Sequence, residues 1–262
     1  MSEQKVYNYE QITENLLKEL ELYPGLIDLM KKCRVMICGG AINSVFTNRK
    51  INDYDLYFRD MEDCTYFYES LKKIPDSISP EITAFKLINI TDNAATFKST
   101  VLKTMIQVIS AEEMIKETPQ EVFELFDWTV CMGAYDFLTE SFVLHDKFLE
   151  DIEKKRLTFN PGTLFPICSL YRSIKYQKRG YHLTGVSTIK LSLTINELHM
   201  ESYRDLKRQL MGIDTLFLQE LTNQWVSGDM ADKAYDAQEA MNLIEKYLEQ
   251  KLVETNGEEN DF

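Results

Sequence analysis

The chain has 262 residues, of which 44% are hydrophobic and 27% charged, a balance typical of a globular protein with its own core. With only 10 glycines and 6 prolines, collagen-like and low-complexity architectures are excluded. No apolar run approaches the roughly 18 residues of a membrane span, and the polar N-terminus shows no signal peptide, so we expect no membrane association. The five scattered cysteines form no CxxC pair, which predicts a reduced, cytoplasmic protein without a disulfide framework or zinc site.

The formal net charge of −13 argues against nucleic-acid binding by the whole surface, but one stretch differs from this average. Residues 154–196 contain no Asp or Glu. Their basic residues are Lys154, Lys155, Arg156, Arg172, Lys175, Lys178, Arg179 and Lys190. Solvated faces normally mix both signs, so this stretch predicts a surface that faces an anion. The alternative is an ordinary solvated helix face.

Apolar periodicity and turn residues predict alternating helices and strands in the first half of the chain. Helices are expected over 9–23, 26–32, 62–73 and, for the most part, 111–126. Strands are expected over 34–38, 54–58, 82–90, 94–99, 104–110, 129–135 and 141–144. A further helix begins at 41–46, directly after a Gly-Gly pair. This pattern predicts a mixed sheet flanked by helices.

From about Asp146 the pattern becomes helical throughout. Helices are expected over 146–155, 165–179, 187–198, 202–211, 215–223 and 230–252. The last residues carry acids and no base, and we expect them to be disordered. The sequence therefore predicts an α+β domain over 1–145, an all-helical domain over 146–253 and an acidic tail over 254–262.

Two neighbouring features carry the candidate chemistry. Gly39 and Gly40 close one strand and open a helix, which offers backbone N–H groups to a phosphate. Asp53 and Asp55 open the next strand, where residues two apart share a face, so both carboxylates converge. Two like charges this close repel each other, and a hard divalent cation such as Mg²⁺ relieves the repulsion. A site for a nucleoside triphosphate and metal follows, with two-metal phosphoryl transfer as its chemistry.

Four segments in order resemble the polymerase β-type nucleotidyltransferases, and most closely the head and neck of CCA-adding tRNA nucleotidyltransferases and bacterial poly(A) polymerases. The first is Ile-Cys-Gly-Gly-Ala-Ile at 37–42 followed by Asp-Tyr-Asp-Leu at 53–56. The second, at 126–136, resembles the family's Arg-Asp-Phe-Thr-x-Asn-Ala-x-Ala-Tyr. The others, at 148–157 and 170–181, resemble the turn into the neck and the neck helix. The chain also resembles small nucleotidyltransferase-like proteins of bacteriophages, which would act in the host cytoplasm.

This resemblance implies roles for particular residues. Asp53 and Asp55 would be catalytic and would hold Mg²⁺ or Mn²⁺. The residues assigned to the nucleotide are Gly39, Gly40, Asn43, Ser44, Asp127, Arg172, Lys175 and Arg179. The last three share one face of a helix, since they follow i, i+3, i+7 spacing, and we expect that face to turn toward the carboxylates. The implied ligands are ATP or CTP and the 3′ end of an RNA such as a tRNA.

The sequence also departs from the family pattern. Asn43 stands where the family has an arginine, although Ser44 can still bind a phosphate oxygen. Phe126 replaces the arginine before Asp127. On the strand where many members place a third carboxylate, this chain offers Gln107, whose neutral amide is neither a base nor an anionic ligand.

Two hypotheses therefore remain from the sequence. In the first, the protein is an active nucleotidyltransferase, which the retained carboxylates and glycines favour. In the second, it is a catalytically inactive binding or structural module, which the missing arginines, Gln107 and the acidic composition favour. Transfer of label from each NTP to RNA would separate them.

Overall fold

A computed structural model describes residues 6–76, 79, 81–91, 93–100, 105–210 and 230–254. The chain divides into two compact units, Met1–Thr163 with Tyr181–Thr184 and Leu164–Gly180 with Gly185–Phe262. This division falls later than the expected boundary at 145. Asp151 explains part of the difference, because it is fully buried and accepts hydrogen bonds from Thr129 and Arg156 inside the first unit.

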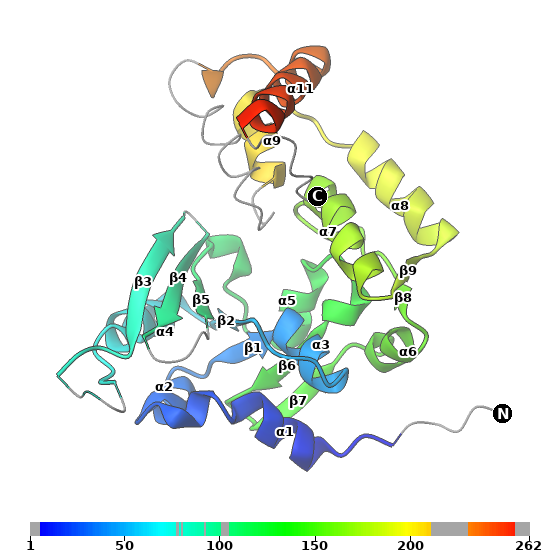
Figure 1. The fold of residues 1–262 in the computed structure, drawn as a ribbon. Coiled ribbons are helices and arrows are strands. Elements are labelled where there is room, and N and C mark those ends of the chain that lie inside the picture. The colour runs from blue at the N-terminus through cyan, green and yellow to red at the C-terminus, as the bar shows by residue number, and fades with distance from the viewer. Residues whose placement is uncertain are drawn as a thin grey trace. The chain divides into compact units, whose positions relative to one another are not determined.

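The first unit is built on a seven-stranded sheet of order β3-β4-β5-β2-β1-β6-β7 (Figure 1). Its strands are β1 (Met36–Cys38), β2 (Asp53–Tyr57), β3 (Phe85–Ile90), β4 (Ala94–Ser99), β5 (Met105–Ile109), β6 (Gly133–Asp136) and β7 (Ser141–Leu144). Only β2 and β5 pair in parallel, and the other pairs are antiparallel. The expected mixed sheet is confirmed.

Helices pack against one face of this sheet. They are α1 (Tyr9–Leu17), α2 (Leu26–Lys32), α3 (Gly40–Phe46), α4 (Met61–Leu71) and α6 (Phe148–Glu153), whereas α5 (Pro119–Glu124) lies on the other face. On the covered face, the hydroxyl of Tyr54 in β2 donates to the Leu16 carbonyl of α1 at 3.0 Å. Phe97 of β4 packs against Tyr68 of α4, with ring centroids 5.5 Å apart. Strands β2, β5 and β4 therefore alternate between buried and accessible residues, as one-sided burial requires.

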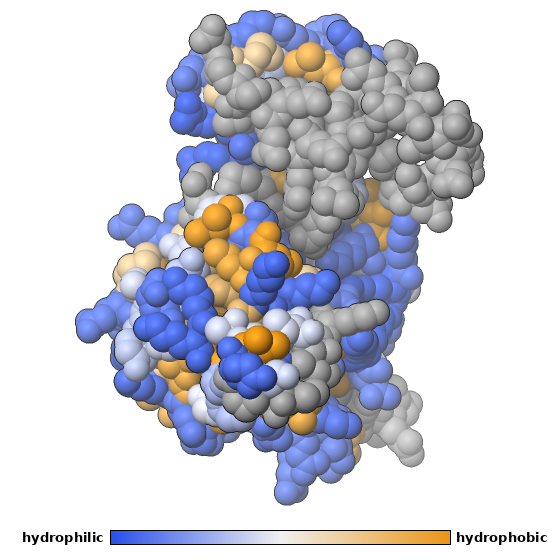
Figure 2. Space-filling model, turned by 60° about the vertical axis from the view of Figure 1, so that its left-hand side comes forward, coloured by the Kyte–Doolittle hydropathy of each residue, from blue (hydrophilic) through white to orange (hydrophobic). Residues whose placement is uncertain are grey.

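The other face of the sheet is covered only in part. Helix α5 places Val122 and Phe123 in a cluster with Met36, Cys38 and Tyr57 of β1 and β2. Beyond this cluster the side chains are half-buried or exposed, and we call this region the open sheet face. Its residues are Asp53, Asp55, Met105, Gln107, Thr96, Lys98 and Lys86. The surface seen from the β3 and β4 side is mostly hydrophilic, with a limited apolar area (Figure 2).

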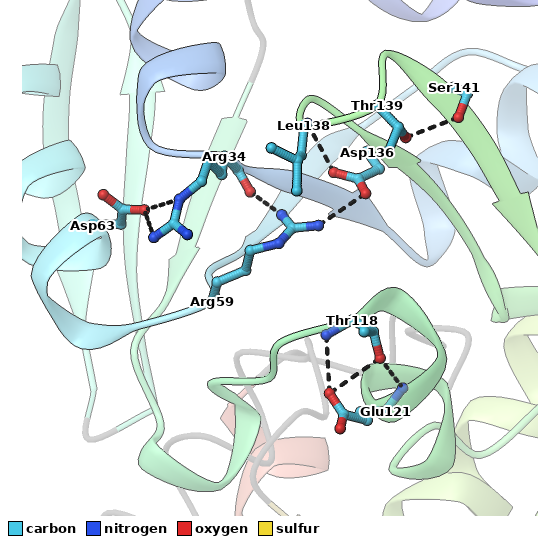
Figure 3. A network of polar contacts seen from close by, with 9 residues as sticks. All are labelled: Arg34, Arg59, Asp63, Thr118, Glu121, Asp136, Leu138, Thr139 and Ser141. Carbon is cyan, nitrogen blue, oxygen red and sulfur yellow. Dashed lines mark hydrogen bonds and ion pairs between the residues drawn. The ribbon is translucent and has the colours of Figure 1, made fainter.

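A buried ion pair joins the segment after β2 to β6 (Figure 3). Arg59 Nη2 donates to Asp136 Oδ2 at 2.8 Å, and their side chains are 3% and 5% exposed. Asp136 Oδ1 accepts the N–H of Leu138 at 2.9 Å, and Arg59 also donates to the Arg34 carbonyl. Because both charges are satisfied inside the protein, the pair locks β2 to β6.

The second unit is helical. Its helices are α7 (Pro166–Lys178), α8 (Gly185–Asn196), α9 (Tyr203–Leu210) and α11 (Ala237–Glu254). Tyr203, Leu206 and Ala240 form its buried cluster, which joins α9 to α11. The helix expected over 215–223 and the tail from 255 on lie outside the described residues. None of the described helices is long and apolar enough to cross a membrane.

Some local expectations were wrong. Residues 129–131 form a 3-10 helix, and the strand begins at Gly133, because local hydrogen bonds at Cys131 and Met132 close tight turns. The helix expected over 111–126 is confined to Pro119–Glu124, where Thr118 and Glu121 make a capping box (Figure 3), with a short 3-10 helix at Glu112–Met114. A two-stranded parallel sheet, β8 (Arg156–Leu157) and β9 (His182–Leu183), was not expected, since two-residue strands leave no periodic signal.

Candidate functional site

The two predicted carboxylates lie on the same face of β2. Asp53 and Asp55 are both half-buried, with the buried Tyr54 between them on the opposite face. A Cβ atom added to Gly39 would lie 3.8 Å from Asp55 Oδ2, so the glycine turn borders the carboxylate. The strand–glycine–helix–strand order of the sequence thus brings glycine and carboxylate together.

The glycine turn has a backbone that other residues rarely adopt. Gly39 has φ +79° and ψ −127°, and its N–H donates to the Gly133 carbonyl at 3.1 Å. Gly40 begins α3, and a Cβ added there would meet no atom within 4 Å. The remaining residues of α3 are buried. The backbone at Gly40 is therefore open to a ligand, while the rest of the helix belongs to the core.

Asn43 and Ser44 lie within that buried helix. Asn43 is fully buried, and its Nδ2 donates to the Val130 carbonyl at 2.9 Å and to the Tyr181 hydroxyl at 3.1 Å. Ser44 is only 7% exposed. These contacts favour structural roles for both residues. Their contact with a nucleotide stays a prediction that the burial does not support.

Gln107 occupies the position beside Asp55 on the neighbouring strand. The parallel register of β2 and β5 pairs Asp55 with Gln107 and Asp53 with Met105. Among the described residues, no group of three or more His, Cys, Asp or Glu side chains could hold a metal ion. The donor set is therefore two carboxylates, which fits Mg²⁺, because this ion keeps several waters and uses one or two carboxylates with substrate phosphates.

The Cys38 thiol also faces this side of the sheet, opposite Asp55 in the register of β1 and β2. Burial, followed by the negative charge of Asp55, raises the pKa of Cys38 well above its ordinary value. This shift favours the neutral thiol in the protein without metal.

The segment that carries Asp127 is held by a residue that the sequence did not single out. Asn160 Nδ2 donates to the carbonyls of Glu124 and Phe126 at 2.9 and 2.8 Å, and its N–H donates to the Asp127 carbonyl at 2.8 Å. Asn160 thereby satisfies carbonyls at and beyond the C-terminus of α5, which have no partner within a helix. The only sequence signal was the turn-forming Asn-Pro-Gly run of residues 160–162.

Phe126 closes one side of the glycine turn. Its ring carbon Cε2 would lie 3.7 Å from a Cβ atom on Gly39, and its ring packs 5.7 Å from that of Tyr57. Asp127 itself is 3% exposed. An aromatic ring therefore stands beside the turn, at the position where the resembling family has a guanidinium.

The basic stretch divides between the two units. Lys154 pairs with Glu150 at 2.7 Å, and Arg156 pairs with Asp151 at 2.5 Å, so acids just before the stretch neutralise two of its charges. The predicted nucleotide-binding cations Arg172, Lys175 and Arg179 lie in the second unit, on α7 and directly after it. Their approach to the carboxylates of the first unit stays a prediction.

Sequence comparison relates this chain to Gabija anti-defense 2 proteins. The model of the Gabija anti-defense 2 family matches residues 5–155. A protein of Bacillus phage SPbetaL7 named "Gabija anti-defense 2" is 33% identical over 244 residues, which cover 90% of this chain and 56% of that protein. The chain thus spans little more than half the length of this curated relative.

Solved structures of CCA-adding enzymes share the fold. The complex with ATP has a TM-score of 0.55 at 14% identity and covers 85% of this chain and 56% of that enzyme. The complex with CTP has a TM-score of 0.54 at 14% identity, covering 93% and 54%. The Thermotoga maritima CCA-adding enzyme complexed with tRNA has a TM-score of 0.50 at 13% identity, covering 93% and 55%. The polymerase β-type nucleotidyltransferase fold is therefore confirmed.

Proposed function

The chain belongs to the Gabija anti-defense 2 protein family, and from this premise we propose that it counters the Gabija defence in the host cytoplasm by nucleotide transfer. It would take a nucleoside monophosphate from ATP or CTP and attach it to a hydroxyl acceptor, a tRNA-like RNA 3′ end. The observation that carries the proposal is the pair Asp53 and Asp55 on one strand face, bordered by the Gly39 turn, where an added Cβ atom would lie 3.8 Å from Asp55 Oδ2.

In this proposal Asp53 and Asp55 hold Mg²⁺ or Mn²⁺. When bound, the cation neutralises the phosphate charge that grows as the phosphoryl group is transferred. The glycine turn binds the triphosphate through the backbone at Gly40, where a Cβ atom would meet nothing within 4 Å, while Gly39 sets the shape of the turn. Phe126 and Asp127 border the nucleotide, and Asn160 positions both.

The reaction exchanges one bond for another. A bond forms between the acceptor oxygen and the α-phosphorus, and the bond from that phosphorus to the bridging oxygen breaks. Pyrophosphate leaves with the bonding electrons, and the hydroxyl proton is released to water. Arg172, Lys175 and Arg179 would bind phosphates of the nucleotide or the acceptor.

The second candidate function is an inactive nucleotidyltransferase-like module that binds its target without transfer. Gln107 favours this alternative, because it stands in register with Asp55 and carries an amide that cannot accept the hydroxyl proton as a base. The buried Asn43, at the position of a family arginine, favours it as well.

The deciding experiment is transfer of α-labelled NTP to RNA with Mg²⁺, using the wild-type chain and Asp53→Asn/Asp55→Asn. We expect labelled RNA from the wild type and at least about a 1000-fold lower rate from the double variant, or about 4 kcal/mol in transition-state stabilisation. Asp28→Asn/Asp146→Asn is a matched control, since both of these carboxylates are exposed. Protection of phage in cells that carry the Gabija defence is scored in parallel. Protection by wild type and double variant alike, without labelled RNA, would establish the inactive module instead.

A further inference from the structure

Two lysines face each other directly on the open sheet face. The antiparallel register pairs Lys86 of β3 with Lys98 of β4, and both side chains are exposed. The row continues through Met105 of β5 to Asp53 of β2. Because registered partners point to the same side of a sheet, both ammonium groups lie on the face that carries the carboxylates.

The two lysines repel each other, and no contact within the described fold offsets this repulsion. Like charges directly opposite each other on paired strands are destabilising. Among the residues that the structure describes, neither Lys86 nor Lys98 makes an ion pair with an acid. Lysines often protect an edge strand from aggregation, which accounts for Lys86 on the edge strand β3. Strand β4 is interior, so Lys98 needs another reason.

The row lies on the opposite side of the carboxylates from the glycine turn. Strand β1, which leads into Gly39, borders β2 on one side, and β5, β4 and β3 follow on the other. Neighbouring strands lie about 4.8 Å apart, so Lys98 is about 10 Å and Lys86 about 14 Å from Asp53 across the sheet. A triphosphate at the glycine turn would leave this row free for a second anionic ligand.

We propose that Lys86 and Lys98 bind the phosphodiester backbone of a nucleic-acid acceptor strand and guide its end toward Asp53 and Asp55. The proposal rests on the function proposed above, and it adds a binding site within the first unit. Two cations in succession match a chain of repeated phosphates, whereas a single nucleotide at the glycine turn ends before it reaches them. The chemistry is shared by RNA and DNA, and the test separates the two.

The test measures binding of a fluorescein-labelled 12-nucleotide strand, as RNA and as DNA, by anisotropy without NTP or Mg²⁺. We expect Lys86→Gln/Lys98→Gln to bind about tenfold more weakly at low salt than the wild type. Its salt dependence should also fall by about 1.4 in slope, since each single-strand phosphate contact contributes about 0.7. Lys73→Gln/Lys147→Gln is the matched control, because it removes two exposed lysines that lie outside the strands of the sheet, one just after α4 and one just before α6. Weaker binding of either the RNA or the DNA strand by the lysine variant supports the site. The strand that the wild type binds more tightly identifies the acceptor.

Two results would overturn the site. One is strand binding by Lys86→Gln/Lys98→Gln that equals binding by the control variant. The other is an equal loss of affinity for a fluorescent ATP analogue, which would assign the lysines to the triphosphate. Since no reaction takes place in this assay, it is independent of transfer. Labelled RNA from the wild type, with unchanged strand binding by the lysine variant, would refute the lysine site alone.

Discussion

The segment 53–59 carries accessible like charges at one end and a buried pair of opposite charges at the other. At one end, Asp53 and Asp55 place two like charges on one half-buried face, bordered by an open glycine turn. At the other, Arg59 meets Asp136 in a buried pair whose remaining hydrogen-bonding groups contact backbone atoms. The first arrangement brings together two oxygen donors of the kind that a divalent cation prefers, and the second is a buried ion pair within the fold. The same short segment therefore carries the candidate ligand site and a structural contact.

The largest expected effect is at the anchor. Arg59→Met leaves the buried carboxylate of Asp136 without its partner, so the free energy of unfolding should fall by about 3–5 kcal/mol. Urea denaturation measures it. Lys31→Met is the control, because the Lys31–Glu140 pair is exposed and screened by solvent, so its loss should change stability little. Equal losses in the two variants would show that the buried pair is no anchor.

A smaller effect is expected at Asn160. Asn160→Asp keeps the shape of the side chain but removes the N–H donors to the Glu124 and Phe126 carbonyls, which should cost about 1–3 kcal/mol in unfolding free energy. Asn196→Asp, at an exposed helix end, is the control. If Asn160 positions the nucleotide-binding segment, KM for the NTP should rise as well. An unchanged KM together with full stability would contradict this role.

The smallest effect on stability is expected at the carboxylates. Asp53→Asn/Asp55→Asn removes two neighbouring negative charges, so the unfolding free energy without metal should stay the same or rise by up to about 1 kcal/mol. Thermal unfolding with and without Mg²⁺ tests this, since only the wild type should gain stability from the ion. A fall in unfolding free energy as large as that of Arg59→Met would show that these carboxylates stabilise the fold. The two ends of the segment would then not differ in role.

The sequence alone was enough to predict most strands of the sheet in order and the shared strand face of the two carboxylates. Strand alternation was enough to place Asp53 and Asp55 on one face, and the expected strand 104–110 correctly carried Gln107 to the site as β5. The helix at 26–32 and the strand at 141–144 matched the structure to the residue. These features are local, because periodicity and turn residues act over a few neighbouring positions.

Only the tertiary structure decided which polar groups are available to a ligand. The sequence assigned Asn43 to the nucleotide, yet the fold buries it, and its Nδ2 donates to the Val130 carbonyl and the Tyr181 hydroxyl, both far along the chain. Lys154 and Arg156 looked like part of a basic surface, but acids on α6 pair with them. The Lys86–Lys98 row depends on cross-strand register, which long-range pairing sets and no local pattern encodes. Burial, ion pairing and register join residues distant in sequence, so they become visible only when the chain is folded.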